Sequence, residues 1–204
     1  MEKITKLAAL IVAILVMLQC KKAELTSHLQ KDTPAVSQNI KASEDQHQHA
    51  HTDQDDSKYI SKELKIIGDV VNPLTITVDS LKKMNVREFK DFKIVCQSGL
   101  TKESTHSTKG VLLKDILEKA KIIQKDHTDR NFYIVAKATD GYKATFSWGE
   151  IFNNPNGEQI YVVFEQNGEP LKNKGEMVLV SLNDTKTGPR HVKWLKSIEV
   201  TRVQ

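Results

Sequence analysis

Cysteine is almost missing from this 204-residue sequence, which contains only Cys20 and Cys96. The two lie far apart in unlike surroundings, so we do not pair them as a disulfide, and each needs its own explanation. Aromatic residues are also scarce, at 6% of the chain, too few for the stacking platforms that bind nucleic-acid strands. The net charge is only +4, and most lysines have acidic residues nearby. Because no basic face is indicated, we expect no nucleic-acid partner.

Long apolar runs are absent too. The apolar stretch 7–18 has 12 residues, whereas a helix needs roughly 20 to cross a bilayer. Lys3 and Lys6 precede it, and this order is typical of a secretory signal peptide. Cys20 follows shortly after and resembles the acylated cysteine of a bacterial lipoprotein signal. We therefore expect residues 1–20 to be a lipoprotein-like signal peptide and Cys20 to carry lipid.

This signal predicts an exported protein that is anchored to a bacterial membrane, on its periplasmic or cell-surface side. A plain secreted protein and an uncleaved N-terminal anchor are the alternatives. In each case the chain would work outside the cytoplasm.

Residues 21–57 are rich in Gln, Ser, Asp, His and Lys and show no apolar periodicity of a helix or a strand. Such a segment buries too little apolar surface to offset its ordering entropy, so we expect a disordered polar tether. Three alternating histidines, His47, His49 and His51, lie in it with carboxylates nearby. Neutral imidazole binds zinc, copper or nickel, so these histidines are a candidate weak metal site. A solvated linker is the alternative reading.

After this tail, strand-like segments outnumber helical ones. The predicted strands are 64–68, 74–78, 92–96, 132–138, 142–147, 159–165, 177–182 and 198–203. The apolar spacing predicts a helix over 110–120, and Asp79 is a candidate N-cap for a short helix over 80–84. The polar stretch 97–109 is expected to be a loop, and strand 159–165 is apolar on both faces, as in a central strand. Residues 58–204 are thus predicted to form one α+β domain with mixed β-sheets and a few short helices.

Five short motifs follow one another in this domain. They are Ile94–Gly99, Thr108–Leu117, Ala138–Tyr142, Asn167–Leu171 and Gly188–Leu195. Together they resemble the molybdopterin-binding domain of the sulfite oxidase family, and the last motif is the most specific of them. The resemblance covers nearly all of the domain. It implies the sulfite-oxidase-type fold, an oxidoreductase activity on a small molecule, and molybdenum–molybdopterin as the cofactor.

The resemblance also implies roles for single residues. Cys96 would ligate molybdenum, for which a soft thiolate is a suitable donor. Arg190 and Lys193 would hold the phosphate of the pterin, and at a spacing of three they would share one face of a helical turn, with Trp194 turned toward the core. Tyr142 would hydrogen-bond the substrate or a metal-bound oxygen and help to move a proton. A buried structural cysteine, a solvated basic turn and an ordinary hairpin tyrosine are the alternatives.

The sequence departs from the family's pattern after the cysteine, where Gln97-Ser98-Gly99 replaces a segment of the glycine-asparagine-arginine type. The chain beyond the signal has only four arginines. A doubly charged oxyanion such as sulfite would need several fixed cationic donors, so we do not expect sulfite as the substrate. His106, in the polar stretch after Cys96, is interpreted as a surface histidine, with a place in the same pocket as the alternative.

Two functions of different classes follow. The first is a molybdopterin-dependent oxidoreductase domain that acts on a small molecule outside the cytoplasm. The second is a cofactor-free lipoprotein that uses the same fold, or its histidine tail, to bind another ligand or a divalent metal. General export moves an unfolded chain across the membrane, whereas the family implies a cofactor inserted into a folded chain in the cytoplasm. The export route therefore favours the second function, and the motifs favour the first. In both, the chain meets the membrane through its N-terminal lipid.

Overall fold

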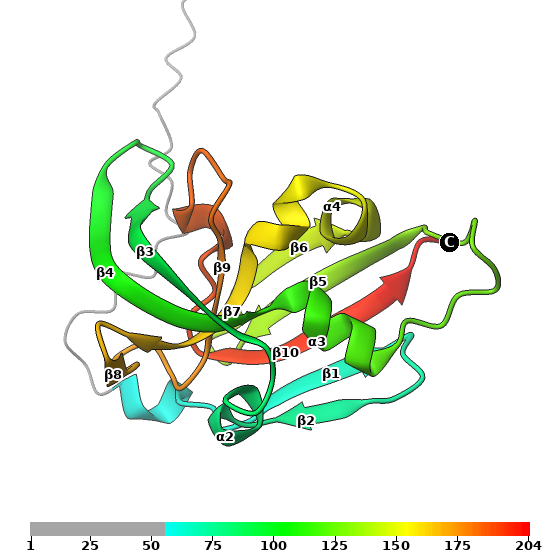
Figure 1. The fold of residues 1–204 in the computed structure, drawn as a ribbon, viewed down its shortest axis with the longest axis horizontal. Helices are drawn as coiled ribbons and strands as arrows, with labels where there is room; N and C mark the ends of the chain where they lie inside the picture. Colours follow the sequence, from blue (N-terminus) through cyan, green and yellow to red (C-terminus); the bar gives the residue numbers. More distant parts are fainter. Residues whose placement is uncertain (1–55) are drawn as a thin grey trace, which may run out of the picture. The chain divides into compact units, whose positions relative to one another are not determined.

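Strands and a few short helices make up the part of the chain that the structure describes (Figure 1). This part is residues 56–204 of a computed structural model, so the predicted signal, Cys20 and the histidines His47, His49 and His51 lie outside the described residues. The combination of mixed sheets with few helices confirms the predicted α+β class. None of the helices within residues 56–204 has the length and apolar character needed to span a membrane.

The first sheet has the strand order β2-β1-β10-β5-β6. Its strands are β1 (Leu64–Gly68), β2 (Leu74–Ile76), β5 (Phe132–Ala138), β6 (Lys143–Ser147) and β10 (Leu195–Arg202). β1 and β10 pair in parallel, and the other pairs are antiparallel. The sheet thus joins the first strand of the domain to the last, which lie side by side in Figure 1.

The second sheet has the order β3-β4-β7-β8, and β9 also pairs with β7. Its strands are β3 (Val86–Val95), β4 (Thr101–Leu112), β7 (Ile160–Gln166), β8 (Glu169–Pro170) and β9 (Val178–Ser181). β7 lies between β4 and β9, and its first five residues are all buried. The prediction of a central strand with two apolar faces is therefore confirmed.

The main hydrophobic core joins both sheets to helix α3 (Leu113–Ala120). Leu113, Ile116, Leu117 and Ala120 of this helix are fully buried, as the predicted apolar stripe requires. Burying one such leucine or isoleucine completely is worth roughly 1.5–3 kcal/mol relative to leaving it exposed. The stripe therefore holds α3 against the sheets.

A second, smaller core lies on the other side of the second sheet. Along β7, Val162 belongs to the main core, whereas its neighbours Tyr161 and Val163 belong to the second core, because successive side chains of a strand point to opposite faces. β3 adds Phe92 and Ile94 to the second core. The β3–β4 hairpin is therefore anchored by its own apolar contacts, which matters because β3 ends at the candidate metal ligand.

The predicted polar loop 97–109 is wrong, because most of it forms β4. β4 pairs with β3 along most of its length, and its last residues, 108–112, also pair with β7. Hydrogen bonds between strands therefore satisfy polar groups of its backbone. Thr105 and Thr108 are buried, and their hydroxyl groups hydrogen-bond to each other at 3.0 Å. β4 is thus a strand of mostly polar residues that is held by backbone pairing. Apolar periodicity in the sequence cannot reveal such a strand.

The helix predicted over 110–120 begins later, at Leu113, because Gly110 belongs to β4. A Cβ atom on Gly110 would lie 2.7 Å from the carbonyl oxygen of Val162. The backbone of β7 lies so close that only glycine fits here. Gly110 pairs with Val163 of β7, so the chain is still a strand at this position.

The short helix near residue 80 is α2 (Val78–Leu81), and its N-cap is Thr77, not Asp79 as predicted. The Thr77 hydroxyl accepts a hydrogen bond from the Ser80 backbone N–H at 3.3 Å, and the Ser80 hydroxyl accepts one from the Thr77 N–H at 3.0 Å. This reciprocal capping satisfies two N–H groups at once, which a cap two residues later would leave unpaired.

One further α-helix, α4 (Trp148–Phe152), follows β6 directly and is capped by Ser147. Short 3-10 helices are η1 (Asp56–Tyr59), η2 (Pro155–Gln159) and η3 (Gly188–Arg190). The sequence did not predict α4 or these 3-10 helices, because they are too short to show apolar periodicity.

The position of Gly110 makes the assignment of β4 testable. In a strand against β7, Gly110→Ala introduces a clash and should lower the free energy of unfolding by about 1–3 kcal/mol. In a helix, the same change would raise it by about 0.5–1 kcal/mol. Gly149→Ala is the matched control, because Gly149 lies in α4 and nothing stands within 4 Å of its Cβ position. Urea unfolding of both variants measures the difference, and a stabilised Gly110→Ala would contradict the strand.

Candidate functional site

Cys96 follows the last residue of β3 and begins a tight turn, at a strand end as the sequence predicts. Its backbone N–H donates to the Leu100 carbonyl at 2.9 Å, and its carbonyl accepts from the Gly99 N–H at 2.9 Å. The side chain is a free thiol that is 6% exposed, yet it belongs to neither hydrophobic core. The thiol is therefore held by a closed backbone turn, outside both apolar cores.

The 3-10 helix η3 lies directly against this cysteine. The Thr187 hydroxyl donates to the Lys93 carbonyl at 2.7 Å and accepts from the Val95 N–H at 2.8 Å. A Cβ atom on Gly188 would stand 2.9 Å from the Val95 carbonyl oxygen and 3.3 Å from the Cys96 Cα atom. Thr187 thus joins η3 to the end of β3, and only glycine fits between them.

Tyr142 reaches the same 3-10 helix from the first sheet. Its phenol donates a hydrogen bond to the Pro189 carbonyl at 2.6 Å. The β5–β6 turn that carries it is fixed by Asp140, whose carboxylate accepts from the Tyr142 N–H at 2.9 Å, and by Gly141 with a φ of 92°. The second sheet contributes Cys96 and the first contributes Tyr142, so the candidate site lies where the two sheets meet at η3.

Arg190 ends η3, and two carboxylates bind its guanidinium group. Nε donates to Asp184 at 2.7 Å, Nη2 also bonds to Asp184, and Nη1 donates to Glu150 at 2.7 Å. The guanidinium carbon stands 4.5 Å from the centre of the Phe146 ring. The hydrogen bonds that Arg190 donates, to Asp184 first and also to Glu150, raise its pKa against the opposing effect of burial. Arg190 therefore fixes η3 to α4 and to the loop after β9.

The expected helical turn that would place Arg190 and Lys193 on one face is wrong. η3 ends at Arg190, and Val192 forms an antiparallel bridge with Leu179 of β9. This bridge extends the backbone after Arg190, so the two basic residues do not follow helical spacing. Lys193 is exposed, with its ammonium group 5.8 Å from the ring centre of Trp194.

Trp194 and Leu195 are buried, as predicted from the sequence. Trp194 adopts a positive φ of 47°, and its backbone N–H donates to the Lys174 carbonyl. A Cβ atom on Gly175 would lie 2.9 Å from the Trp194 Cα atom, so the glycine of the 171–177 segment leaves room for this backbone. The strained tryptophan is therefore held between the end of η3 and that segment.

His191 was not singled out from the sequence, although it lies inside the specific motif Gly188–Leu195. Its side chain is buried, with 8% exposed, and its Nε2 atom has no hydrogen-bond partner within residues 56–204. Burial first, and then the charges of Lys174 and Lys193, lower the pKa of His191 from the usual 6.5 to about 3. The imidazole is therefore neutral at pH 7, and its Nε2 atom is buried.

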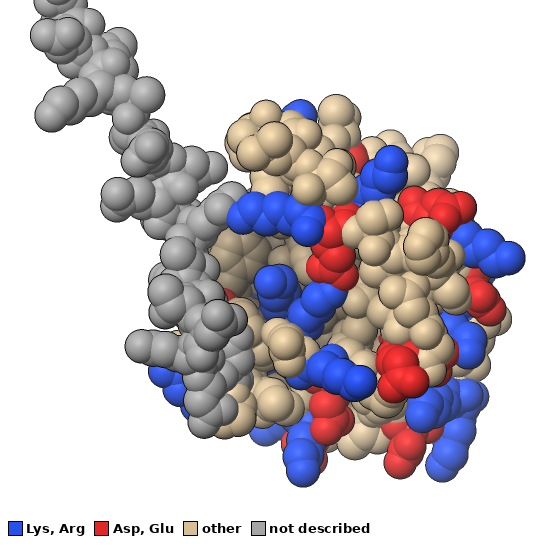
Figure 2. All heavy atoms as spheres, turned by 90° about the vertical axis from the view of Figure 1, so that its left-hand side faces the viewer, with Lys and Arg blue, Asp and Glu red and all other residues tan. Residues whose placement is uncertain are grey.

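Basic side chains gather on this side of the domain. Figure 2 faces the side that carries the β3–β4 hairpin and shows lysine and arginine side chains around a hollow in the surface. Lys186, which precedes Thr187, has its ammonium nitrogen 3.1 Å from the position that a Gly99 Cβ would take. Lys174 pairs with Glu103 and donates to the Gln166 side-chain oxygen at 2.9 Å. Lys186 thus lies beside the turn after Cys96, whereas the charge of Lys174 is offset by Glu103.

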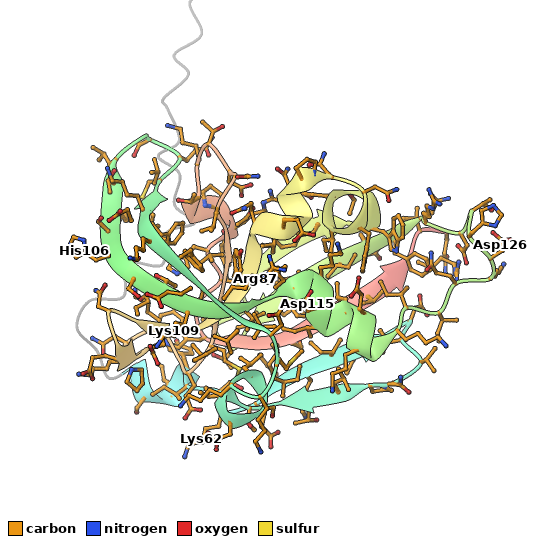
Figure 3. The ribbon with its side chains drawn as sticks, viewed as in Figure 1. Lys62, Arg87, His106, Lys109, Asp115 and Asp126 are labelled. Atoms are coloured by element: carbon orange, nitrogen blue, oxygen red, sulfur yellow. The ribbon has the colours of Figure 1, made fainter. Side chains whose placement is uncertain are left out.

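His106 lies apart from this site. Its ring nitrogen is 3.7 Å from the Asp91 carboxylate, and its side chain is 92% exposed. Figure 3 shows it on the outer side of β4. The interpretation of His106 as a surface histidine is confirmed. Within residues 56–204, no cluster of three or more histidine, cysteine or acidic side chains could hold a metal ion.

Residues 49–204 match the family model described as the oxidoreductase molybdopterin binding domain. The chain belongs to this family. The resemblance to the molybdopterin-binding domain of sulfite oxidase-type proteins, inferred above from five motifs, is therefore confirmed. Membership of the family implies binding of a molybdenum cofactor.

Among similar proteins is the nitrate reductase [NADPH] of Leptosphaeria maculans, which is 28% identical over 167 residues. The match covers 72% of this chain but only 18% of that reductase, so the chain spans a small part of its relative's length. The sulfane dehydrogenase SoxCD of Paracoccus pantotrophus has a similar solved structure, with a TM-score of 0.49 and 17% identity over 74% of this chain and 40% of that one.

The buried imidazole predicts a pH dependence of stability. Below pH 6.5 the unfolded chain takes up a proton at His191, whereas the folded chain does so only near pH 3. The free energy of unfolding should therefore fall as the pH drops through this window, by about 2 kcal/mol between pH 7 and pH 5 from this residue alone. In His191→Gln the part of this fall that comes from His191 should be absent. His106→Gln, on the exposed surface, is the control and should keep it. Urea unfolding at both pH values measures it, and an unchanged slope in His191→Gln would contradict it.

Proposed function

We propose that the chain binds a molybdenum–molybdopterin cofactor through Cys96 and serves as an oxidoreductase domain for a small-molecule substrate. The observation that carries this proposal is the convergence of Cys96, Tyr142 and the family's most specific motif on the 3-10 helix η3. The thiol is free and buried outside both apolar cores.

The residues present fit such a cofactor. Molybdenum is a metal for soft sulfur donors, and Cys96 supplies one at a fixed turn. The cofactor is anionic, and Lys186 supplies a positive charge beside the turn, with its ammonium nitrogen 3.1 Å from the position that a Gly99 Cβ would take. When bound, the cofactor supplies oxygen-atom or electron transfer to the substrate.

The protein's own side chains would bind the pterin phosphate and move a proton. Lys193 pairs with no carboxylate within the described residues, so its ammonium group is available to hold the pterin phosphate. Arg190 is already held by Asp184 and Glu150, so its contribution to a phosphate contact would require release from them. The Tyr142 phenol, now a donor to Pro189, can donate to a substrate oxygen and move a proton.

The predicted signal extends this proposal to the location of the protein. Lipid on Cys20 would tether the domain to a bacterial membrane, and the substrate would then be a small molecule outside the cytoplasm. The polar segment 21–57 would give the domain reach from the membrane surface.

One observation favours a second function, a cofactor-free lipoprotein that binds another ligand. The guanidinium group of Arg190, expected on the pterin phosphate, is occupied by two carboxylates of the protein itself. In this version the site at η3 binds another ligand, or the tail with His47, His49 and His51 binds a divalent metal. Deletion of residues 45–56 would then abolish zinc or copper binding of micromolar or weaker affinity.

Metal analysis separates the two functions. Full-length protein purified from its own membrane after molybdate-replete growth should carry one molybdenum and one pterin per chain. Cys96→Ser should lower the molybdenum content at least tenfold, since a hydroxyl is a far poorer ligand for a soft metal. Ser98→Ala, on the same turn, should retain it. Elemental analysis and pterin fluorescence measure both, and wild-type protein without molybdenum would refute the first function.

A further inference from the structure

Most of the exposed apolar side chains of the described residues lie at one end of the first sheet. Within residues 56–204, seven large apolar side chains are more than a third exposed, and five of them are at this end: Ile67, Val71, Ile123, Tyr133 and Val203. The other two are Ile60 and Leu100. Exposed apolar residues that are scattered singly need no explanation, whereas a group of them marks an interaction surface.

The strand register places three of the five on the outer face of this sheet. In β1 and β5, buried and exposed residues alternate, so one face packs on the main core and the other is exposed. Tyr133 pairs with Thr201 of β10, and Val203 follows Thr201 by two positions. Ile67 pairs with Glu199, two positions before Thr201. Residues at a spacing of two share a face, so Ile67, Tyr133 and Val203 all point away from the core.

Val71 and Ile123 lie at the same end of the sheet. They flank the bridge between Val70 and Ile122, whose own side chains are buried. The Arg202 guanidinium group donates to the Ile123 carbonyl at 2.8 Å, which holds this segment beside the end of β10. We call the five exposed apolar residues the sheet-end patch. It lies near the C-terminal residue marked in Figure 1.

We propose that the sheet-end patch is an interface between two copies of this chain, which pack the outer faces of their first sheets together about a two-fold axis. A standard interface buries about 800 Å² per partner, and somewhat more than half of that area is apolar. Five half-exposed isoleucine, valine and tyrosine side chains supply apolar area of this order. The proposal does not rest on the molybdenum cofactor, because Cys96 and η3 take no part in the patch.

The charges on the same face favour a second copy as the partner. Glu199 lies between Ile67 and Val135 in the strand register, and it pairs with Lys137 of β5. The side chains of Lys137 and Glu199 are 35% and 32% exposed, so both still present charge at the surface. In a two-fold interface each contact occurs twice, so each Lys137 meets Glu199 of the other copy. An anionic lipid surface would instead require an excess of basic residues.

Sedimentation velocity of the full-length chain across the micromolar range tests the interface. The wild-type chain should show a reversible monomer–dimer equilibrium. Tyr133→Lys should raise the dissociation constant at least tenfold, because association would desolvate an unpaired charge. Leu100→Lys is the matched control. Leu100 is 70% exposed in the turn between β3 and β4, in the other sheet, so its replacement should leave the dissociation constant unchanged.

An exchange of charges tests the two-fold geometry. Glu199→Lys gives each copy two lysines at these positions, and Lys137→Glu gives each copy two glutamates. Either variant alone should associate at least tenfold more weakly than wild type, because like charges then meet across the axis. An equimolar mixture of the two variants should regain most of the affinity, because each lysine then meets a glutamate. Association through other parts of the chain, such as the apolar stretch 7–18, would not show this recovery.

Three results would each overturn the proposal: a wild-type chain that stays monomeric, a Tyr133→Lys variant that associates as tightly as wild type, or a mixture without recovery. Flotation with vesicles of phosphatidylethanolamine and phosphatidylglycerol tests the other partner of an apolar face. Vesicle binding by a monomeric wild-type chain that Tyr133→Lys abolishes would assign the patch to a lipid surface and not to a dimer. None of these measurements depends on bound molybdenum.

Discussion

The candidate site depends on one hydroxyl group, that of Thr187. It donates to the Lys93 carbonyl of β3 and accepts from the Val95 N–H of the same strand. These residues precede Thr187 by 94 and 92 positions, so the hydroxyl group joins two distant segments of the chain. Because of this join, Gly188 lies against Cys96, Pro189 is within reach of Tyr142, and Lys186 stands over the turn after the cysteine. A threonine that satisfies its hydrogen bonds in this way gains stability for both segments and fixes the geometry of the site.

The basic residues next to η3 differ in their partners. Arg190, at the end of η3, is bound by the carboxylates of Asp184 and Glu150 and so belongs to a structural ion-pair network. Lys186, before η3, and Lys193, after it, have no carboxylate partner within the described residues. The planar guanidinium group, with its fork of donors, suits the network that holds η3 in place.

Sequence reasoning predicted the parts of the fold in which apolar pattern and structure coincide. The stripe of α3 and the two apolar faces of β7 are of this kind, as is the burial of Trp194. It failed for β4, whose polar residues are held by backbone pairing with β3, and for the shared face of Arg190 and Lys193, which the bridge at Val192 breaks. Cys96 and Tyr142 came from the family motifs, whereas Lys186 and His191 acquire meaning only from tertiary neighbours that no local pattern records.

The residues of the site stand largely outside the apolar cores, and this separates stability from function. Cys96 belongs to neither core, so its replacement need not open a cavity in one. The Nε2 atom of His191, buried without a hydrogen-bond partner in the described chain, lowers the stability of the empty domain. A group that hydrogen-bonds to this nitrogen would recover that free energy and would stabilise the folded state by its binding.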